Sequence, residues 1–358
     1  MSAESNQSLS EKPKQSGSRL FSAIRRSDLR WLWTVLALLI ILFVNRLVSP
    51  NFFEIRMVND RLVGSLINVI DSSAPYILLA IGMTLVIATK GIDLSVGAVM
   101  AISASVAVVL VKQYEAGSTA FYVQPGFAIL IAILVGALCG LFNGVMVAYM
   151  ELQPFIATLI LMVAGRGVAQ LITGGQSPTF TNESLAFVGR GVVGGMPVPI
   201  IFSIIVLLLV MLLVRRTALG LMIESVGAND KASHYAGIPG RNIKLLAYII
   251  CSMCAALAGL MVAGEVKSAD PHKAGLYIEA DAILAVVIGG TLFSGGRFYL
   301  VRSAIGAVII QALVIGLYVS SLHPTTNLVV KSFVVLSVLL LQSEDVRRMV
   351  SRRLRRTA

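Results

Sequence analysis

The amino-acid sequence predicts an all-α protein that crosses a membrane about ten times, with both termini in the cytoplasm. Of its 358 residues, 57% are hydrophobic and only 13% are charged, about half of the ~25% that is usual in soluble domains. Long runs such as Ile129–Val147 and Ile200–Val214 are apolar on every side, whereas a surface helix of a soluble protein has a polar face. Because a bilayer core takes ~20 apolar residues per helix, we expect these runs to span it.

The expected membrane segments follow the apolar runs along the chain. No small-residue cleavage site follows the first run, so we expect it to be retained as a span rather than removed with a signal peptide. A polar cytoplasmic tail, 1–30, precedes the membrane domain, 31–342, and a basic cytoplasmic tail, 343–358, follows it. The ten segments are expected at 31–49, 74–89, 94–112, 126–149, 154–172, 199–214, 244–264, 280–294, 303–319 and 326–342.

Lysine and arginine are distributed unevenly between the loops, which predicts the orientation of the chain. The net charge is +11, and cytoplasmic loops of membrane proteins retain more basic residues than outer loops do. This explains the positive charge without a nucleic-acid partner. With Lys244 and Lys112 counted in the adjacent loops, the inner segments hold 20 Lys and Arg and the outer segments hold 6. The inner segments are then 1–30, 90–93, 150–153, 215–243, 295–302 and 343–358.

The stretch LVIATKGIDLSVGAVM, residues 85–100, interrupts an apolar run that is too long for one helix. A second glycine-rich interruption lies at 289–296. Short, glycine-interrupted helices are typical of the discontinuous helices of transporters, so we expect a short helical piece before each interruption. Asp93 then either caps a helix that begins at Leu94 or faces a solute path together with Ser95.

Small residues predict two packing features inside the membrane. Gly136, Gly140 and Gly144 recur every four residues, which lets a neighbouring helix of the same chain approach closely. Cys251 and Cys254 have the CxxC spacing, but no further ligand or thiol pair accompanies them. We therefore expect two small buried residues rather than a redox or zinc site.

The segment 215–243 is the most polar interior part of the chain, and we expect it to form a short amphipathic helix at the cytoplasmic surface. Gly227 and Asn229 can end that helix, and a second short piece, 230–236, ends at Gly237. A plain solvated connector is the alternative. Apolar residues recur with helical spacing at Leu219, Met222, Ile223 and Val226.

The sequence lacks the motifs of several enzyme classes. There is no G-x-x-x-x-G-K-[ST] loop for ATP, no HExxH and no G-x-S-x-G. The three histidines are divided between one inner and two outer loops, so they cannot form one metal site. We therefore expect neither an enzyme nor a resident cofactor or metal. The histidines are His234, His272 and His323.

An ion-coupled secondary carrier is the main alternative to a transporter that is powered by another subunit. Such carriers keep ionisable residues inside the membrane as relays, and Asp93, Arg166 and Asp281 could serve in this role. These residues are sparse. An apolar bundle with one organised cytoplasmic loop favours an energy source outside the chain.

Four stretches of the sequence are informative together: AIGMTLVIATKGIDLSVGAVMA, GLFNGVMVAYMELQPFIATLILMVAGRGVAQLITGGQ, TALGLMIESVGANDKASHYAGI and EADAILAVVIGGTLFSGGRF. They resemble the permease subunits of bacterial ABC sugar importers of the ribose, xylose and galactose type. Within this family the sequence is most similar to galactofuranose-importer permeases, especially in QPFIATLILMVAGRGVAQLITGGQ. The resemblance implies an inner-membrane permease that works with a cytoplasmic ATPase, a periplasmic sugar-binding protein and a second permease subunit, identical or related. Related ABC permeases for branched-chain amino acids share this architecture and are a further alternative.

The resemblance also implies roles for particular residues. In this family a coupling helix docks on the ATPase, and it corresponds here to the segment 215–243, called the surface segment. We expect its contacts with the ATPase at Glu224, Gly227, Asn229, Ala236 and Gly237. A neutral sugar needs transient hydrogen-bond partners along its path, and interhelical hydrogen bonding is the alternative role of each such partner. The path candidates are Asp93, Ser95, Asn143, Gln153, Phe155, Thr158 and Asp281. We expect Arg166 to be structural, either paired with an acid or with carbonyl groups, or snorkelling outward.

Overall fold

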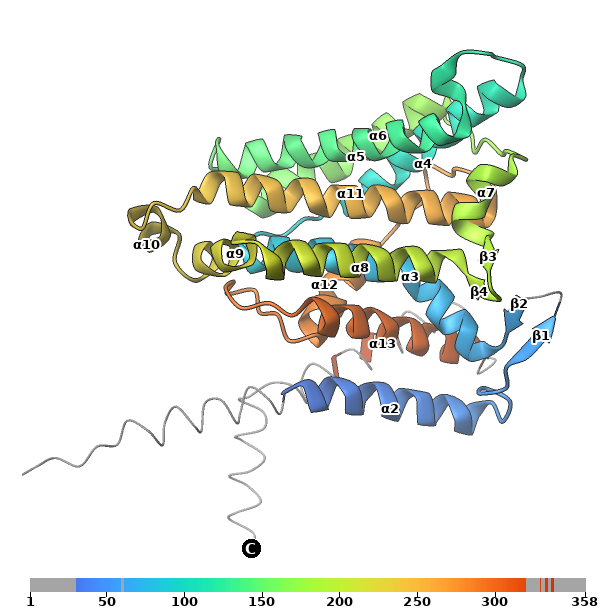
Figure 1. The fold of residues 1–358 in the computed structure, drawn as a ribbon, viewed down its shortest axis with the longest axis horizontal. Helices are drawn as coiled ribbons and strands as arrows, with labels where there is room; N and C mark the ends of the chain where they lie inside the picture. Colours follow the sequence, from blue (N-terminus) through green and yellow to red (C-terminus); the bar gives the residue numbers. More distant parts are fainter. Residues whose placement is uncertain (1–29, 59–60, 320–328, 330–331, 334–335, 338–358) are drawn as a thin grey trace, which may run out of the picture.

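The protein is a bundle of long helices that lie side by side, with short elements gathered at the two ends of the bundle (Figure 1). The predicted tails, up to residue 29 and from residue 343, fall outside the described residues, as do His323 and nearly all of the tenth predicted segment, 326–342. The structure, a computed structural model, describes residues 30–58, 61–319, 329, 332–333 and 336–337.

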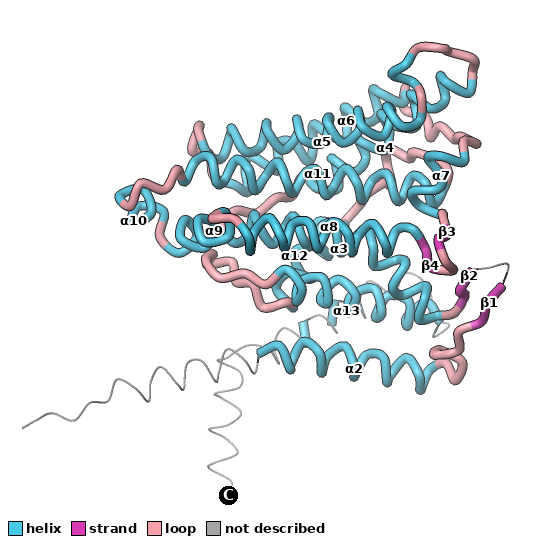
Figure 2. The backbone as a smooth tube through the Cα atoms, viewed as in Figure 1, coloured by secondary structure: helices cyan, strands magenta, loops and turns pink. Residues whose placement is uncertain are grey.

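The described chain is mostly helical, as predicted (Figure 2). Among the described residues, seven helices are long and apolar enough to span a membrane: α3 (Ser65–Ala88), α4 (Val96–Glu115), α5 (Pro125–Ala148), α6 (Pro154–Thr173), α8 (Val198–Arg216), α11 (Gly240–Val266) and α13 (Leu300–Val319). They correspond to seven of the ten predicted segments. The first predicted segment is α2 (Arg30–Val48), whose apolar part, Thr34–Val48, is shorter. The other helical elements are η1 (Phe121–Val123), α7 (Glu183–Arg190), α9 (Leu219–Ala228), α10 (Asp230–Tyr235) and α12 (Ile278–Ile288).

Two predicted elements have the wrong length. The helix before the first interruption is not short, because α3 begins at Ser65 and runs for 24 residues. Polar residues in its first turns, Asn68 and Asp71, give that part of the sequence the character of a loop. The predicted span 280–294 is instead the 11-residue helix α12, which confirms the short helix expected before the second interruption. Glycines follow α12 directly, and Gly290 adopts a left-handed φ of 90° that a helix cannot continue.

Two short hairpins at one end of the bundle depart from the all-α prediction (Figure 2). The antiparallel pairs are β1 (Arg56–Val58) with β2 (Arg61–Val63), and β3 (Val192–Val193) with β4 (Met196–Pro197). Gly194 and Gly195 connect β3 to β4 with φ angles of 58° and 82°, which suit the two-residue turn of a hairpin. The sequence VVGGMP therefore indicates a hairpin, which a search for apolar spans alone does not detect.

The loops that were predicted to be cytoplasmic meet at the end of the bundle that carries α9 and α10 (Figure 1). Lys90 Nζ donates to the Ala228 carbonyl at 3.2 Å. Arg241, at the start of α11, pairs with Glu151 in the α5–α6 loop at 2.7 Å. Since these contacts join three loops that are distant in sequence, the predicted grouping of these loops on one side is confirmed.

The loops that were predicted to be outer meet at the opposite end. Lys267, after α11, pairs with Glu183 of α7 at 2.7 Å. Glu115, at the end of α4, accepts hydrogen bonds from the backbone N–H groups of Thr181 and Asn182 at 2.7 and 2.6 Å. These contacts tie the ends of α4 and α11 to the loop that contains α7.

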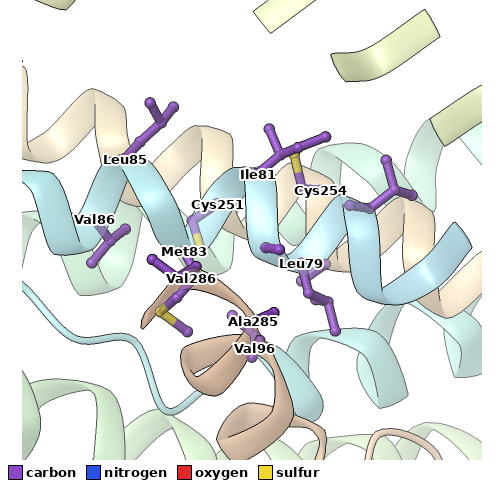
Figure 3. Packing of buried hydrophobic residues seen from close by; sticks show 14 of the residues in the cluster. Leu79, Ile81, Met83, Leu85, Val86, Val96, Cys251, Cys254, Ala285 and Val286 are labelled. Atoms are coloured by element: carbon purple, nitrogen blue, oxygen red, sulfur yellow. The ribbon is translucent and has the colours of Figure 1, made fainter. Parts of the chain in front are cut away.

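Helices α3 and α11 form the centre of the hydrophobic core (Figure 3). Leu79, Met83 and Leu85 of α3 are fully buried. Cys251 and Cys254 of α11 are buried and free, so the prediction of two small packed residues is confirmed. Because lipid tails are as apolar as these side chains, close packing rather than removal from water stabilises the contact.

The glycine stripe of α5 packs against α11 of the same chain, as predicted. Gly136 and Gly144 face Ala256 and Leu245 of α11. A Cβ atom at Gly140 would lie 2.6 Å from the Tyr248 carbonyl oxygen, closer than atoms can pack. The stripe therefore fixes the separation of two helices that surround the polar cluster described below.

Candidate functional site

One membrane crossing begins with non-helical chain at the end of the bundle that carries α9 and α10, called here the inner end. Helix α3 ends at Ala88, and α4 begins only at Val96; residues 89–95 are called the inner segment here. The Gly296 N–H donates to the Ala88 carbonyl at 2.9 Å, which joins the loop after α12 to the start of this segment. The inner segment then leads to an α4 that begins inside the bundle.

A second crossing begins with non-helical chain at the opposite end of the bundle, called here the outer end. Helix α11 ends at Val266 and α12 begins only at Ile278; residues 267–277 are called the outer segment. The two broken crossings meet where Gly97 of α4 lies against Gly275 of the outer segment. A Cβ atom at Gly97 would overlap the Gly275 carbonyl oxygen and the Glu279 carboxylate, so only glycine permits this contact.

A buried polar cluster lies at the end of the inner segment. Asp93 Oδ1 accepts hydrogen bonds from the Ser95 backbone N–H at 2.9 Å and from the Ser95 hydroxyl at 2.6 Å. Asn143 Nδ2 of α5 donates to Ser95 Oγ at 2.8 Å and to Asp93 Oδ1 at 3.4 Å. All three side chains are fully buried. The structure thus brings together three of the predicted path residues but places none of them on an open surface.

Asp93 lies at the entry to α4 but is not its N-cap residue. Helix α4 begins at Val96 rather than at Leu94, and its N-cap residue is Ser95, whose side chain makes no capping bond. Asp93 instead accepts the N–H of the residue two positions later, which is the pattern of an Asx turn. The simple N-cap is therefore wrong, although Asp93 does shape the entry into the helix.

Thr158 of α6 joins the same region. Its hydroxyl donates to the Ile92 carbonyl of the inner segment at 3.3 Å and to its own helix, at Pro154, at 2.9 Å. The Tyr248 hydroxyl of α11 also donates to Ile92, at 3.4 Å. Helices α6 and α11 therefore both hold the inner segment. Hydrogen bonding between helices is sufficient to explain these contacts, and no solute is needed.

Gln153 and Phe155 lie nearer the inner end than this cluster. Gln153 lines a cavity of about 1090 Å³ that Lys90, Tyr149 and Asp230 also line. Phe155, the second residue of α6, is 47% exposed. Gln153 thus borders open space at the inner end of the bundle and Phe155 is exposed, in contrast to the buried cluster.

Asp281 lies on a different element from the other path candidates. It is in the first turn of α12, buried, and within electrostatic range of Tyr76 on α3. Among the described residues, no group of three or more histidine, cysteine or acidic side chains is placed to hold a metal ion.

Arg166 of α6 anchors the outer segment. Its guanidinium donates to the Ala274 and Gly275 carbonyls at 3.1 and 2.9 Å, and Nη2 lies 3.8 Å from Glu279 Oε1. The expectation that Arg166 pairs with an acid and with carbonyl groups is therefore confirmed. Glu279 was missed as a site residue, although an acid inside the apolar stretch IEADAILAVVI is itself an indication of function.

The predicted surface segment forms two short helices at the inner end. Helix α9 buries Ile223 and Val226 against the core, so the predicted amphipathic helix is confirmed. The Asn229 side chain accepts the Ala232 N–H at 3.0 Å and caps α10. Ala236 and Gly237 end α10 at the exposed surface, where Gly237 has a φ of 81°.

Two of the predicted coupling residues contact other parts of this chain. Gly227 is buried, and a Cβ atom there would overlap the Ala88 carbonyl oxygen. Glu224 is partly exposed and lines a second cavity, of about 520 Å³, together with Arg215 and Arg302. The end of α9 therefore lies backbone to backbone against the end of α3, while Glu224 faces open space.

These features define a multi-pass helical membrane protein, in which long spans surround two broken crossings and a helix pair is exposed at the inner end. Residues 65–341 match the family described as the permease component of the branched-chain amino acid transport system. Since the match covers more than half of the chain, the chain belongs to this family. It is an inner-membrane protein.

Three relatives resemble the chain over most of its length. The galactofuranose transporter permease protein YtfT of Escherichia coli (strain K12) is 49% identical over 87% of this chain and 89% of its own. The fructose import permease protein FruF of Bifidobacterium longum (strain NCC 2705) is 40% identical over 85% of each. The ribose import permease protein RbsC of E. coli (strain K12) is 35% identical over 87% of this chain and 93% of its own. No solved structure matches the chain significantly.

Proposed function

We propose that the chain is the membrane permease of an ATP-binding-cassette importer for a monosaccharide, galactofuranose or a related sugar. The observation that carries this proposal is the 49% identity to a galactofuranose transporter permease over 87% of the chain, supported by the fructose and ribose import permeases. The sequence has no loop for ATP, so hydrolysis belongs to a separate cytoplasmic subunit. A periplasmic binding protein delivers the sugar, and a second permease subunit completes the path.

Uptake by cells that lack their own permeases for these substrates tests the proposal. The full chain is expressed with its ATPase and binding protein, and labelled galactofuranose, ribose, fructose and leucine are supplied in turn. We expect a sugar to enter and uptake to stop when the ATPase is inactivated. The leucine arm is included because the family takes its description from branched-chain amino acid transport. Uptake of leucine without any sugar would overturn the choice of substrate.

An ion-coupled carrier is tested separately with the purified chain in liposomes. A sodium or proton gradient is imposed without any ATPase subunit. We expect no accumulation of sugar, because the energy comes from another subunit. Accumulation under these conditions would overturn the ATP-driven proposal and give Asp93 the role of an ionisable relay.

We further propose that α9 and α10 form the surface that docks on the ATPase, with Glu224, Gly227, Asn229, Ala236 and Gly237 at or behind the contact. Leu221 and Tyr235 are 72% and 89% exposed on these helices. Because Gly227 packs backbone to backbone against Ala88, a push on α9 would displace the end of α3 and the inner segment. Such rigid movement of a docked element is an established way to transmit a conformational change.

The substitution Glu224→Ala tests the docking surface. We expect uptake to fall at least about tenfold, equivalent to ~1.4 kcal/mol, and less ATPase to co-purify while insertion is unchanged. The matched control is Ser225→Ala, because the Ser225 hydroxyl bonds the Leu221 carbonyl of its own helix. Normal uptake together with normal recovery of the ATPase from the Glu224 variant would show that docking occurs elsewhere.

A further inference from the structure

One face of the chain carries polar side chains near the middle of the membrane. Arg166 lies twelve residues after the start of α6, which places it about 18 Å from the inner end of the helix at 1.5 Å per residue. A bilayer core is ~30 Å thick. The Arg166–Glu279 pair, at 3.8 Å, is therefore remote from both membrane surfaces.

This ion pair is accessible from outside the chain. The side chains of Arg166 and Glu279 are 19% and 11% exposed. Tyr277, at the end of the outer segment, is 71% exposed. Further along α6, Gln170 Nε2 lies 3.4 Å from His272 Nδ1. These five residues come from α6, the outer segment and the first turn of α12, and are called here the polar strip: Arg166, Gln170, His272, Tyr277 and Glu279.

The polar strip differs sharply from the face formed by α8. On α8, Leu208, Leu209 and Leu212 are 51%, 58% and 55% exposed, and no charged residue lies between Val198 and Val214. That composition suits contact with lipid tails. Charged side chains at mid-membrane instead face the bundle interior or a water-filled cavity, and the exposed part of the Arg166–Glu279 pair does not face the interior of this chain.

We propose that the polar strip is one wall of the aqueous sugar path, with the Tyr277 ring as a contact for the apolar face of a sugar. The identity of the solute rests on the proposed function, whereas the presence of water does not. Sugars combine hydroxyl groups with a face of C–H bonds, and a tyrosine provides both an apolar ring and a polar tip. The amide of Gln170 and the imidazole of His272 supply exchangeable hydrogen-bond partners further outward. The second permease subunit provides the opposite wall.

Thiol labelling tests the presence of water at the strip. Tyr277→Cys and Leu208→Cys are expressed separately in the full chain with its ATPase and binding protein. A charged, water-soluble methanethiosulfonate is then added to intact membranes. We expect the cysteine at 277 to react at least tenfold faster than the cysteine at 208, with the wild-type chain and its three native cysteines as background. Equal, slow labelling of both variants would overturn the proposal, because the strip would then be covered by lipid or a dry contact.

Transport by Tyr277 variants tests the sugar contact. We expect Tyr277→Ala to lower the maximal uptake rate about fivefold to tenfold, the effect of losing one aromatic contact, and Tyr277→Phe to stay near wild type. Since the binding protein captures the sugar, the concentration for half-maximal uptake should change little. Wild-type rates in the alanine variant would overturn the contact. If the wild-type chain transports no sugar, the proposed function fails, while the labelling result still decides whether the strip is aqueous.

Discussion

The inner and outer segments have the same place in their broken crossings but are held by different kinds of side chain. Each carries the chain into the bundle without a helix, and each ends at a helix that begins at depth. The inner segment ends in a closed cluster: Asp93 and Ser95 are fully buried, and Asn143 donates to both. The outer segment is partly open, with Tyr277 exposed and the Arg166–Glu279 pair accessible.

The difference separates architecture from contact with solute. Backbone N–H and C=O groups inside a membrane must be bonded within the protein. The inner segment meets this requirement with short local bonds and with the hydroxyls of Thr158 and Tyr248. The outer segment meets it with a charged guanidinium, and a charge needs water or a counter-charge nearby. This contrast supports the proposal that the outer segment lines the path, whereas the bonds of the inner segment join helices.

The largest effect should come from separating the two segments at their contact. Gly97→Val places a side chain against the Gly275 carbonyl and Glu279. Overpacking of this kind costs ~1–3 kcal/mol when side chains can adjust, and we expect a loss of ~3 kcal/mol or more because a backbone carbonyl cannot move aside freely. The measurements are the yield of folded protein in detergent and its thermal unfolding.

The control for this substitution is Gly126→Ala, since the space beside Gly126 is open. Its yield and unfolding temperature should match wild type. A Gly97→Val protein as stable as the control would mean that the segments do not pack against one another as described.

The next largest effect concerns the anchor of the outer segment. Arg166→Met removes two hydrogen bonds to carbonyl groups and leaves Glu279 without its partner. We expect a loss of ~2 kcal/mol, less than for a fully buried pair because both side chains are partly exposed. The double variant Arg166→Met with Glu279→Gln should regain part of that loss in thermal unfolding. Equal stability of the single and double variants would show that the pair is not coupled.

The smallest effect should occur in the inner segment. Asp93→Ala leaves the Ser95 N–H without its acceptor, and we expect a loss of ~1–2 kcal/mol from one unsatisfied buried donor. Asp93→Asn keeps an acceptor oxygen and should retain both stability and uptake. If Asp93→Asn abolishes uptake while thermal unfolding is unchanged, Asp93 acts as an ionisable group and the contrast between the segments fails.

The sequence by itself determined the membrane class, seven long spans, the paired surface helices and the grouping of the loops on two sides. These features depend on composition and on neighbours within a few turns of helix. The length of the apolar runs predicts the spans, the helical spacing of apolar residues predicts α9, and the distribution of basic residues predicts the side of each loop. The sequences of α12 and α3 predicted the lengths of these helices less well. Two glycines after Ile288 shorten α12, while Asn68 and Asp71 conceal the first turns of α3.

Only the tertiary structure decided which polar residues are enclosed and which face outward. Asp93, Asn143 and Thr158 could line a path as well as join helices, and the answer depends on how α4, α5 and α6 pack. Likewise, Arg166 and Glu279 are 113 positions apart in the chain, and the outer segment brings them to 3.8 Å. The exposure of these side chains and their pairing across the bundle arise from helix packing. Packing depends on residues that are distant in sequence, so a local sequence pattern does not predict it.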